Sequence, residues 1–328
     1  MIDYKWLKYK IMDFQEKIEE LRKIIKDNIE PLITSDYVHL DNPYHGNIGD
    51  ILIWEGERQF LSSIKYKCLQ SSSNSWCENY LHPETVILFN GGGNFGDLYR
   101  ECQDFRLRVI EQFPNNRIIM FPQSIWYEDE SLIAKDAAVM ARHNDLTLCA
   151  RDKWSYNFLK EHFGKNKILL VPDMAFYISS RHLQKYQIPC GNKNLLVKRL
   201  DKELSSFDPM TLIHDIDNIE IRDWPSIEKN TLILRQYLIM ATINIKCKNR
   251  FRDIVDLFAN KILKTSLIST GVKFIAAYQN IYTTRLHVAI LSILLHKSCY
   301  IIDNSYGKNS SFYETWLDDM DNIVLLTE

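Results

Sequence analysis

The chain of 328 residues is 46% hydrophobic and 25% charged with a formal net charge of −2, which supports one large or two ordinary domains and argues against a nucleic-acid surface along the whole chain. Its seven cysteines are scattered without a C-x-x-C pair, and this spacing favours reduced thiols over a disulfide framework or a zinc site. Because the N-terminus has no signal-peptide core and the longest apolar run, residues 288–295, is far shorter than the roughly 20 residues that span a bilayer, we expect a soluble, cytoplasmic protein.

The first predicted element is an amphipathic helix over residues 5–29, which ends before Pro31. Its apolar side chains recur at alternating intervals of four and three residues: Leu7, Ile11, Phe14, Ile18, Leu21 and Ile25. Two hypotheses stay open for this helix. Its apolar seam packs on its own domain or on a second copy of the chain, or its aromatic and basic end, residues 4–10, contacts the inner face of a membrane.

From residue 32 onwards, short apolar segments alternate with predicted helices of about ten to fifteen residues. The strands expected in the first half cover residues 37–40, 64–69, 86–89, 117–121, 146–149 and 168–171. The helices expected between them cover residues 51–61, 104–112, 131–142 and 153–162. This alternation predicts a parallel, doubly wound sheet.

Residues 174–194 are irregular and form the predicted crossover to a second set of elements. Its strands are expected at residues 195–198, 280–283, 299–302 and 323–326, and its helices at residues 227–242, 251–263, 267–278, 287–295 and 311–317. Residues 199–226 receive no assignment beyond a loop-rich segment. We therefore predict an α/β fold in which an N-terminal helix (1–31) precedes two Rossmann-like domains, residues 32–178 and 179–328, that face a cleft.

Two glycine-containing turns follow strands of the first predicted domain. Residues 91–96 match G-x-G-x-x-G, but no acidic residue ends the next strand, so NAD binding is a weak hypothesis. The glycines instead allow the backbone to approach a ligand, with Asn94 and Asp97 directed into the cleft, or they serve only a tight turn. In the turn at residues 46–50, Asp50 either caps the next helix or acts as a base on a hydroxyl.

Four side chains are expected at the carboxyl ends of strands, where open α/β sheets bind ligands: Arg151, Arg285, His287 and Lys308. Arg285 and His287 lie where a strand changes to a helix, whose first N–H groups also attract an anion. Each side chain also has a purely structural alternative: the arginines pair with carboxylates, the histidine caps a helix and the lysine is solvated. Their convergence favours a small ligand that bears phosphate and carboxylate groups.

Several segments, taken in chain order, resemble the polysaccharide pyruvyl transferase family. They are GNIGD (46–50), NGGGNFGD (90–97), PQS (122–124), ARDKWS (150–155), PD (172–173), TRLH (284–287) and DNSYGK (303–308). The resemblance covers roughly residues 37–317 and leaves out the N-terminal 30 residues. It implies a two-domain fold similar to that of GT-B glycosyltransferases and an enzyme that transfers pyruvate from phosphoenolpyruvate to two hydroxyls of a sugar. The product would be a pyruvate ketal on a cell-surface polysaccharide or its lipid-linked precursor.

The resemblance also assigns site residues. The donor, phosphoenolpyruvate, is expected to contact Arg151, Arg285, Leu286, His287 and Lys308. The acceptor side is expected to include Asn47, Gly92, Gly93 and Asn94. We expect His287 to deliver a proton to the phosphate, and Asp50 or Asp97 to take the proton of the acceptor hydroxyl.

The expected partners are phosphoenolpyruvate and a saccharide, free or lipid-linked, and not nucleic acid. The chemistry calls for no cofactor and no metal. Two other functions stay open: a GT-B glycosyltransferase that uses a nucleotide sugar, and a non-catalytic saccharide-binding scaffold protein.

Overall fold

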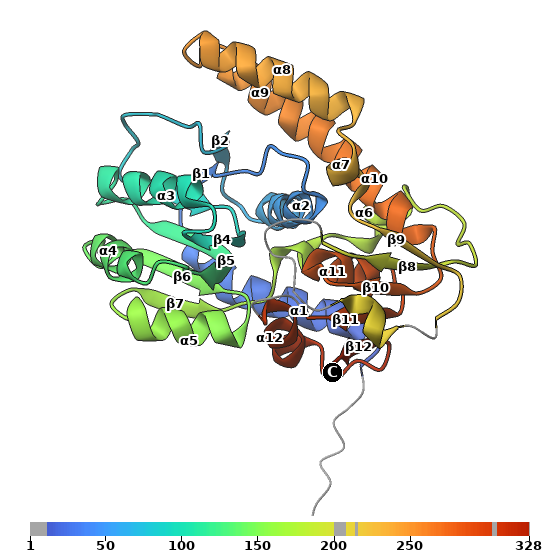
Figure 1. Ribbon diagram of the computed structural model, residues 1–328. Helices are drawn as coiled ribbons and strands as arrows, with labels where there is room; N and C mark the ends of the chain where they lie inside the picture. The colour runs from blue at the N-terminus through green and yellow to red at the C-terminus, as the bar shows by residue number, and fades with distance from the viewer. Residues whose placement is uncertain (1–11, 200–207, 214–215, 304–306, 328) are drawn as a thin grey trace, which may run out of the picture.

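The computed structural model describes residues 12–199, 208–213, 216–303 and 307–327. Its strands form two separate parallel sheets with helices packed around them, so the predicted α/β class is confirmed (Figure 1). Within the described ranges, no helix has the length and apolar content needed to cross a membrane.

The first sheet contains seven parallel strands, in the order β2–β1–β3–β5–β6–β7 with β4 paired to β5. Its strands are β1 (Tyr37–Leu40), β2 (Cys68–Ser71), β3 (Val86–Phe89), β4 (Gly92–Gly96), β5 (Ile118–Trp126), β6 (Leu146–Ala150) and β7 (Lys167–Leu170). Its helices are α2 (Ile48–Ser62), α3 (Arg100–Gln112), α4 (Ser131–Met140) and α5 (Lys153–His162). Strands β1, β3 and β6 are buried along their whole length, as parallel strands covered on both faces must be.

The second sheet has the order β12–β11–β10–β8–β9, again all parallel. Its strands are β8 (Asn194–Val197), β9 (Ile219–Arg222), β10 (Ile281–Thr283), β11 (Cys299–Ile302) and β12 (Ile323–Leu326). Its helices are α7 (Pro225–Glu228), α8 (Leu232–Lys246), α9 (Arg252–Phe258), η4 (Ala259–Leu263), α10 (Lys264–Ala276), α11 (Leu286–Leu294) and α12 (Lys308–Trp316), with a short turn of helix at η3 (Pro209–Leu212). The connection between the sheets contains η2 (Met174–Tyr177) and α6 (Ser180–Gln184).

Each sheet has a point where the direction of strand addition reverses. In the first sheet it lies between β1 and β3, and in the second it lies between β8 and β10. Ligands of doubly wound sheets bind outside the carboxyl ends of the strands at such points. The fold therefore marks two neighbouring ligand-binding edges, one on each sheet.

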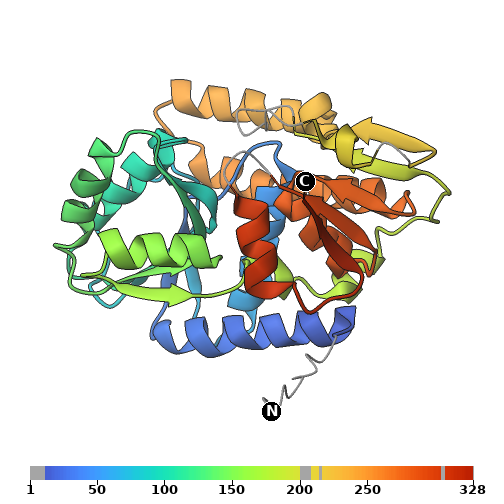
Figure 2. The same cartoon turned by 60° about the horizontal axis from the view of Figure 1, so that its bottom comes forward.

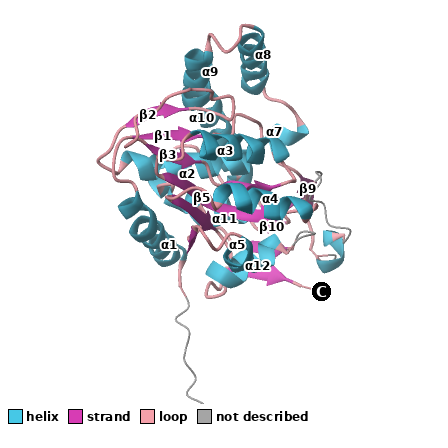
Figure 3. Ribbon diagram, turned by 90° about the vertical axis from the view of Figure 1, so that its left-hand side faces the viewer, coloured by secondary structure: helices cyan, strands magenta, loops and turns pink. Residues whose placement is uncertain are grey.

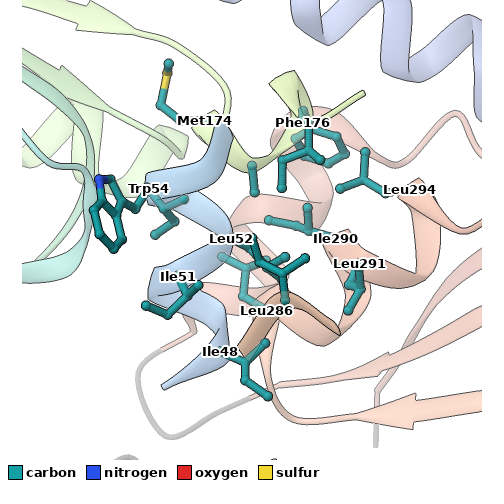
Figure 4. Close-up of a cluster of buried hydrophobic side chains, with 14 of the residues drawn as sticks. Ile48, Ile51, Leu52, Trp54, Met174, Phe176, Leu286, Ile290, Leu291 and Leu294 are labelled. Atoms are coloured by element: carbon teal, nitrogen blue, oxygen red, sulfur yellow. The ribbon is translucent and has the colours of Figure 1, made fainter. Parts of the chain in front are cut away.

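Helix α2 joins the two sheets into one body. Its apolar side chains, including Ile48, Ile51 and Leu52, pack against Leu286 and Ile290 of α11 in a single buried cluster (Figure 4). Figure 4 also shows Met174 and Phe176 of the connecting segment beside this cluster. The predicted division between residues 178 and 179 stays a prediction, because one continuous core spans both sheets.

The N-terminal helix α1 (Phe14–Ile29) runs beneath both sheets (Figure 2). Ile18, Leu21 and Ile25 are fully buried, so its own chain covers the apolar seam. Arg22 donates hydrogen bonds to carbonyls of the connecting segment, and Lys17 pairs with Asp319 at 2.6 Å. The hypothesis that this helix packs on its own chain is confirmed for the described part. Its aromatic and basic end, residues 4–10, lies outside the described residues.

Three segments differ from the predicted secondary structure. The segment without a prediction, residues 199–226, contains the edge strand β9, whose side chains are only partly buried and lack a long apolar run. The glycine-rich segment forms strand β4 instead of a turn. Residues 252–276 form one uninterrupted helical run through a π-helical turn, where the apolar pattern suggested two helices.

Candidate active site

A cavity of about 460 Å³ lies where the carboxyl ends of the two sheets face each other. Both reversal points reach it: Asp41 and Asn90 follow β1 and β3, and Arg199 and Arg285 follow β8 and β10. The predicted site residues that line it are Asn47, Asp50, Gly93, Asn94, Arg151, Arg285, Leu286, His287 and Lys308. The fold therefore brings together residues from both sheets that are far apart in the sequence.

Asp97 and Gly92 are not among the described residues that line this cavity. The Asp97 carboxylate accepts hydrogen bonds from the backbone N–H groups of Glu128, at 2.9 Å, and Asp129, at 2.7 Å. It thus fixes a loop and does not line the cavity, whereas Asp50, the other predicted base, does. Gly92 lies in strand β4 with a φ of 140°, a conformation that favours glycine.

The pairing of β4 with β5 also removes the NAD hypothesis. A dinucleotide fingerprint places its glycines in a turn that opens a helix, so that the pyrophosphate meets the helix N-terminus. Here the glycines lie in a strand, and α3 begins only at Arg100. Gly93 instead allows close approach of a guanidinium, since a Cβ at this position would lie 3.2 Å from Arg151 Nη2.

The N-terminus of α2 presents Asp50 to the cavity. Asn47 is the cap of this helix, and its side-chain oxygen accepts a hydrogen bond from Gly49 N at 3.1 Å. The Asn47 amide also donates to Asp50 Oδ2 at 2.8 Å, while His45 Nε2 lies 3.6 Å from the same oxygen. The hypothesis that Asp50 caps the helix is wrong, because Asn47 has that role, and Asp50 remains the predicted base.

Arg151, Asp173 and His287 form a compact cluster across the two sheets. Arg151 Nη1 donates to Asp173 Oδ2 at 2.9 Å, and His287 Nε2 lies 3.3 Å from the same oxygen. Arg151 Nε donates to Ser124 Oγ at 2.8 Å, which fixes the plane of the guanidinium. Asp173 holds an arginine of the first sheet and the histidine of the second in one geometry. We did not predict a role for Asp173, although it is the aspartate of the PD segment (172–173) of the family pattern.

The Asp173 carboxyl has a depressed pKa. Burial opposes its ionisation, but the charge of and hydrogen bond from His287, together with the charge of Arg151, outweigh burial and lower the pKa from 3.8 to about 2. Ionised Asp173 therefore stabilises the fold at pH values above about 4, and this contribution is lost as the pH falls towards 2.

Asp173→Asn is therefore expected to lower the free energy of unfolding by roughly 2 kcal/mol at neutral pH. The difference from the parent protein should narrow as the pH falls, because the parent loses the contribution of the ionised carboxylate in acid. Urea unfolding at about pH 7 and about pH 3 measures both values. An equal difference at the two pH values would show that Asp173 acts through packing alone.

Gly49 brings the first turn of α2 against His287. A Cβ at this position would lie 2.7 Å from His287 Nδ1, closer than real Cβ contacts allow. Gly49→Ala is expected to displace the imidazole and lower turnover at least ~10-fold, while the higher helix propensity of alanine protects stability. Turnover and melting temperature are measured together, with Ser62→Ala at the far, exposed end of α2 as the control. Normal turnover in Gly49→Ala would show that the position of His287 is not critical.

Arg285 is paired with Asp223, a residue in the segment for which no element was predicted. Arg285 Nη2 donates to Asp223 Oδ2 at 2.7 Å, Nε donates to Oδ1, and both side chains are buried. The structural alternative for Arg285 is thus correct in part, since the residue is paired and also lines the cavity. Arg285 is the N-cap residue of α11, so the alternative that His287 caps this helix is wrong.

Lys308 begins helix α12 and lines the cavity. Only 8% of this residue is exposed, so the alternative that it is solvated is wrong. The preceding Gly307 has a φ of 67°, the left-handed conformation that lets the chain turn into the helix. The Asn309 amide then donates to the carbonyls of Thr284 and Ile302 and fixes the start of α12 beside the Arg285 segment.

Asp41 is a further cavity residue that was not predicted. It directly follows β1, has a φ of 65° and is paired with Arg106 at 2.7 Å. Arg106 also donates to Asn94 Oδ1 at 2.6 Å, so one buried guanidinium fixes both side chains. Burial raises the pKa of Asp41 although Arg106 opposes the shift. The position of Asp41 immediately after a predicted strand was the sequence signal that could have identified it as a cavity residue.

Comparison with known proteins gives a consistent family assignment. Residues 47–306 match the family described as "Polysaccharide pyruvyl transferase". The chain is 28% identical over 321 residues to "Putative pyruvyl transferase EpsO" of Bacillus subtilis (strain 168), covering 97% of this chain and 95% of that protein. It is also 28% identical over 288 residues to "Pyruvyl transferase 1" of Schizosaccharomyces pombe, covering 84% and 68%.

A solved structure has the same fold. The crystal structure of an uncharacterized protein from Klebsiella pneumoniae superposes with a TM-score of 0.62 at 21% identity, covering 95% of this chain and 99% of that one. The likeness therefore extends over nearly the whole of both chains.

Proposed function

Because the chain belongs to the polysaccharide pyruvyl transferase family and is a polysaccharide pyruvyltransferase, we propose that its donor is phosphoenolpyruvate and its product a cyclic pyruvate ketal. The observation that carries the proposal is the set of basic side chains from both sheets that lines one cavity: Arg151, Arg199, Arg285, His287 and Lys308. Phosphoenolpyruvate carries a carboxylate and a phosphate, and arginine forks bind both groups through paired hydrogen bonds.

In the proposed reaction, a proton adds to the methylene carbon of the donor and makes C2 electrophilic. One acceptor hydroxyl forms a bond to C2, the bond from C2 to the phosphate oxygen breaks, and a second hydroxyl of the same sugar closes the ring. The acceptor gains pyruvate less one water, and one phosphate leaves for each ketal formed. The reaction balances without an oxidant, and the proposal includes no cofactor and no metal.

Each side chain has a proposed role in this reaction. Arg151, Arg285 and Lys308 hold the donor and stabilise the charge on the departing phosphate. His287, oriented by Asp173, delivers a proton to the phosphate. Asp50, held by Asn47, accepts the proton of the attacking hydroxyl.

The acceptor side of the cavity is proposed to lie along α2, Gly93 and Asn94. Aromatic side chains among the cavity lining give a sugar ring apolar surface to pack on: Tyr44, Tyr99, Trp224 and Tyr237. The proposed acceptor is a sugar of a cell-surface polysaccharide or of its lipid-linked precursor, and the proposed location is the cytoplasm. We also infer that the two sheets are Rossmann-like domains in a GT-B-like arrangement, a proposal supported by the reversal point in each sheet.

Donor preference tests the proposal. We expect phosphoenolpyruvate to raise the melting temperature and phosphate to be released when a saccharide acceptor is present. Nucleotide sugars are the matched comparison, because a GT-B glycosyltransferase would be stabilised by them and would release nucleotide. Stabilisation by a nucleotide sugar and not by phosphoenolpyruvate would overturn the donor assignment.

A further inference from the structure

Helices α8 and α9 form a hairpin that projects away from the two sheets (Figures 1 and 3). We call residues 232–262 the hairpin surface. Its exposed large apolar side chains are Leu232, Leu238, Ile239, Ile243, Ile245, Phe251, Ile254, Leu257 and Ile262. Leu232 is 72% exposed and Ile245 is 70% exposed, values far above those of ordinary packed helices. Exposed apolar surface on this scale marks a site of interaction.

The exposed residues follow a helical pattern. Leu232, Ile239 and Ile243 are spaced by seven and four residues, so they form one line along the outer face of α8. The opposite face contributes Leu234 and Tyr237 to the core. The inner face of α8 thus packs in the core, whereas the outer apolar line is exposed and is not part of the described core.

The charge of the hairpin surface indicates which kind of partner it fits. Residues 232–262 are all described, and their exposed side chains include five basic ones: Arg235, Lys246, Lys248, Arg250 and Lys261. One exposed side chain, Asp253, is acidic. Apolar side chains interleaved with lysine and arginine fit the boundary between anionic headgroups and acyl chains. A second copy of the same hairpin would place these like charges together, which opposes association.

The hairpin is held in one orientation. Its turn is fixed by Lys248 and Asn249, both in the left-handed conformation, and Asn244 Oδ1 accepts a hydrogen bond from Phe251 N at 2.9 Å. Arg252 pairs with Glu78 of the first sheet's long loop at 2.6 Å. The basic and apolar tip is therefore presented by a rigid element.

The base of the hairpin borders the cavity. Tyr237 of α8 and Ile227 of α7 both line it, and Ser226 donates a hydrogen bond to the Gly46 carbonyl beside α2 at 2.5 Å. The inner face of α8 at the base of the hairpin is therefore next to the aromatic side of the cavity.

From these observations we propose that the hairpin surface docks on an anionic lipid bilayer and so presents the cavity to a saccharide carried on a lipid. Docking is inferred from the hairpin surface alone, whereas the presentation of a saccharide rests on the proposed function. This assigns membrane contact to α8 and α9.

Sedimentation with lipid vesicles tests the proposal with the full chain. The probes are vesicles of phosphatidylcholine alone and of phosphatidylcholine with phosphatidylglycerol. We expect binding to the anionic vesicles, weakened at least ~10-fold by Ile239→Gln/Ile243→Gln/Ile254→Gln and by Lys246→Glu/Lys248→Glu/Arg250→Glu. Leu69→Gln/Ile188→Gln is the control, because it changes exposed apolar residues elsewhere and should bind like the parent.

Three outcomes would overturn the docking. The parent protein does not bind anionic vesicles, the hairpin variants bind as well as the parent, or light scattering shows a parent dimer that the apolar variant converts to a monomer. The last outcome would assign the hairpin surface to a second copy. Circular dichroism verifies that every variant is folded. Pyruvyl transfer to free and to lipid-linked saccharides is measured separately, so its absence with both in the parent protein would contradict the proposed function and leave the docking intact.

Discussion

His287→Ala is expected to lower the rate of pyruvyl transfer at least ~100-fold and to leave a folded protein. The imidazole lines the cavity, and its Nε2 is held between Asp173 and Arg151 at 3.3 and 3.4 Å. In this geometry it is placed to transfer a proton to the donor phosphate, and such a contribution is typically worth 10²–10⁴-fold. Alanine removes the ring but creates no steric clash. The measurement is initial phosphate release at saturating phosphoenolpyruvate and acceptor.

His162→Ala is the matched control for this variant. His162 is the last residue of α5, where it contacts Phe158, and it does not line the cavity among the described residues. The control should retain the turnover of the parent. Turnover of His287→Ala within a few-fold of the parent would contradict the proposed role of the imidazole.

Arg285→Ala is expected to abolish measurable transfer and also to destabilise the fold by about 3–5 kcal/mol. The second effect follows from Asp223, whose buried carboxylate would lose its paired hydrogen bonds from the guanidinium. Removing one member of a buried ion pair leaves an uncompensated charge in the interior. Urea unfolding measures the stability, and phosphate release at low temperature measures activity in the folded fraction.

The double variant Arg285→Ala/Asp223→Asn separates the two effects. A neutral amide at position 223 removes the buried charge, so part of the lost stability should return while the activity stays low. If the double variant regained near-normal turnover, the only role of Arg285 in activity would be to neutralise the buried charge of Asp223. If the single variant were as stable as the parent, the ion pair would contribute nothing to folding.

The sequence pattern was sufficient for the elements that are apolar and regular. The predicted strand at residues 299–302 and helix at residues 153–162 have the bounds of β11 and α5, because polar residues flank the apolar strand and Asp152 caps the start of the helix. Strand β9 was missed because it has only four residues, is partly buried at the edge of its sheet and lacks the apolar run of the central strands. The glycine-rich strand β4 was missed because glycine has a low strand propensity, and only its pairing with β5 defines it.

The cationic part of the site was predictable, and its anionic partners were not. Arginine and lysine at strand ends are visible in the sequence because every parallel strand directs its carboxyl end to the same edge. Asp223 and Asp173 lie 62 and 114 residues from Arg285 and His287, so only the folded chain reveals which carboxylate pairs with which cation. Asp97 is the converse case, since a carboxylate after a glycine-rich segment accepts hydrogen bonds from a neighbouring loop and does not line the cavity.

Mass spectrometry of the acceptor tests the proposed reaction most directly. The protein is incubated with phosphoenolpyruvate and a panel of free and lipid-linked saccharides, with His287→Ala in a parallel reaction. We expect one class of saccharide to gain the mass of pyruvate less one water, with one phosphate released per product and almost no product from the variant. If no saccharide gained this mass, or if a saccharide gained a sugar from a nucleotide sugar instead, ketal formation from phosphoenolpyruvate in this cavity would be contradicted.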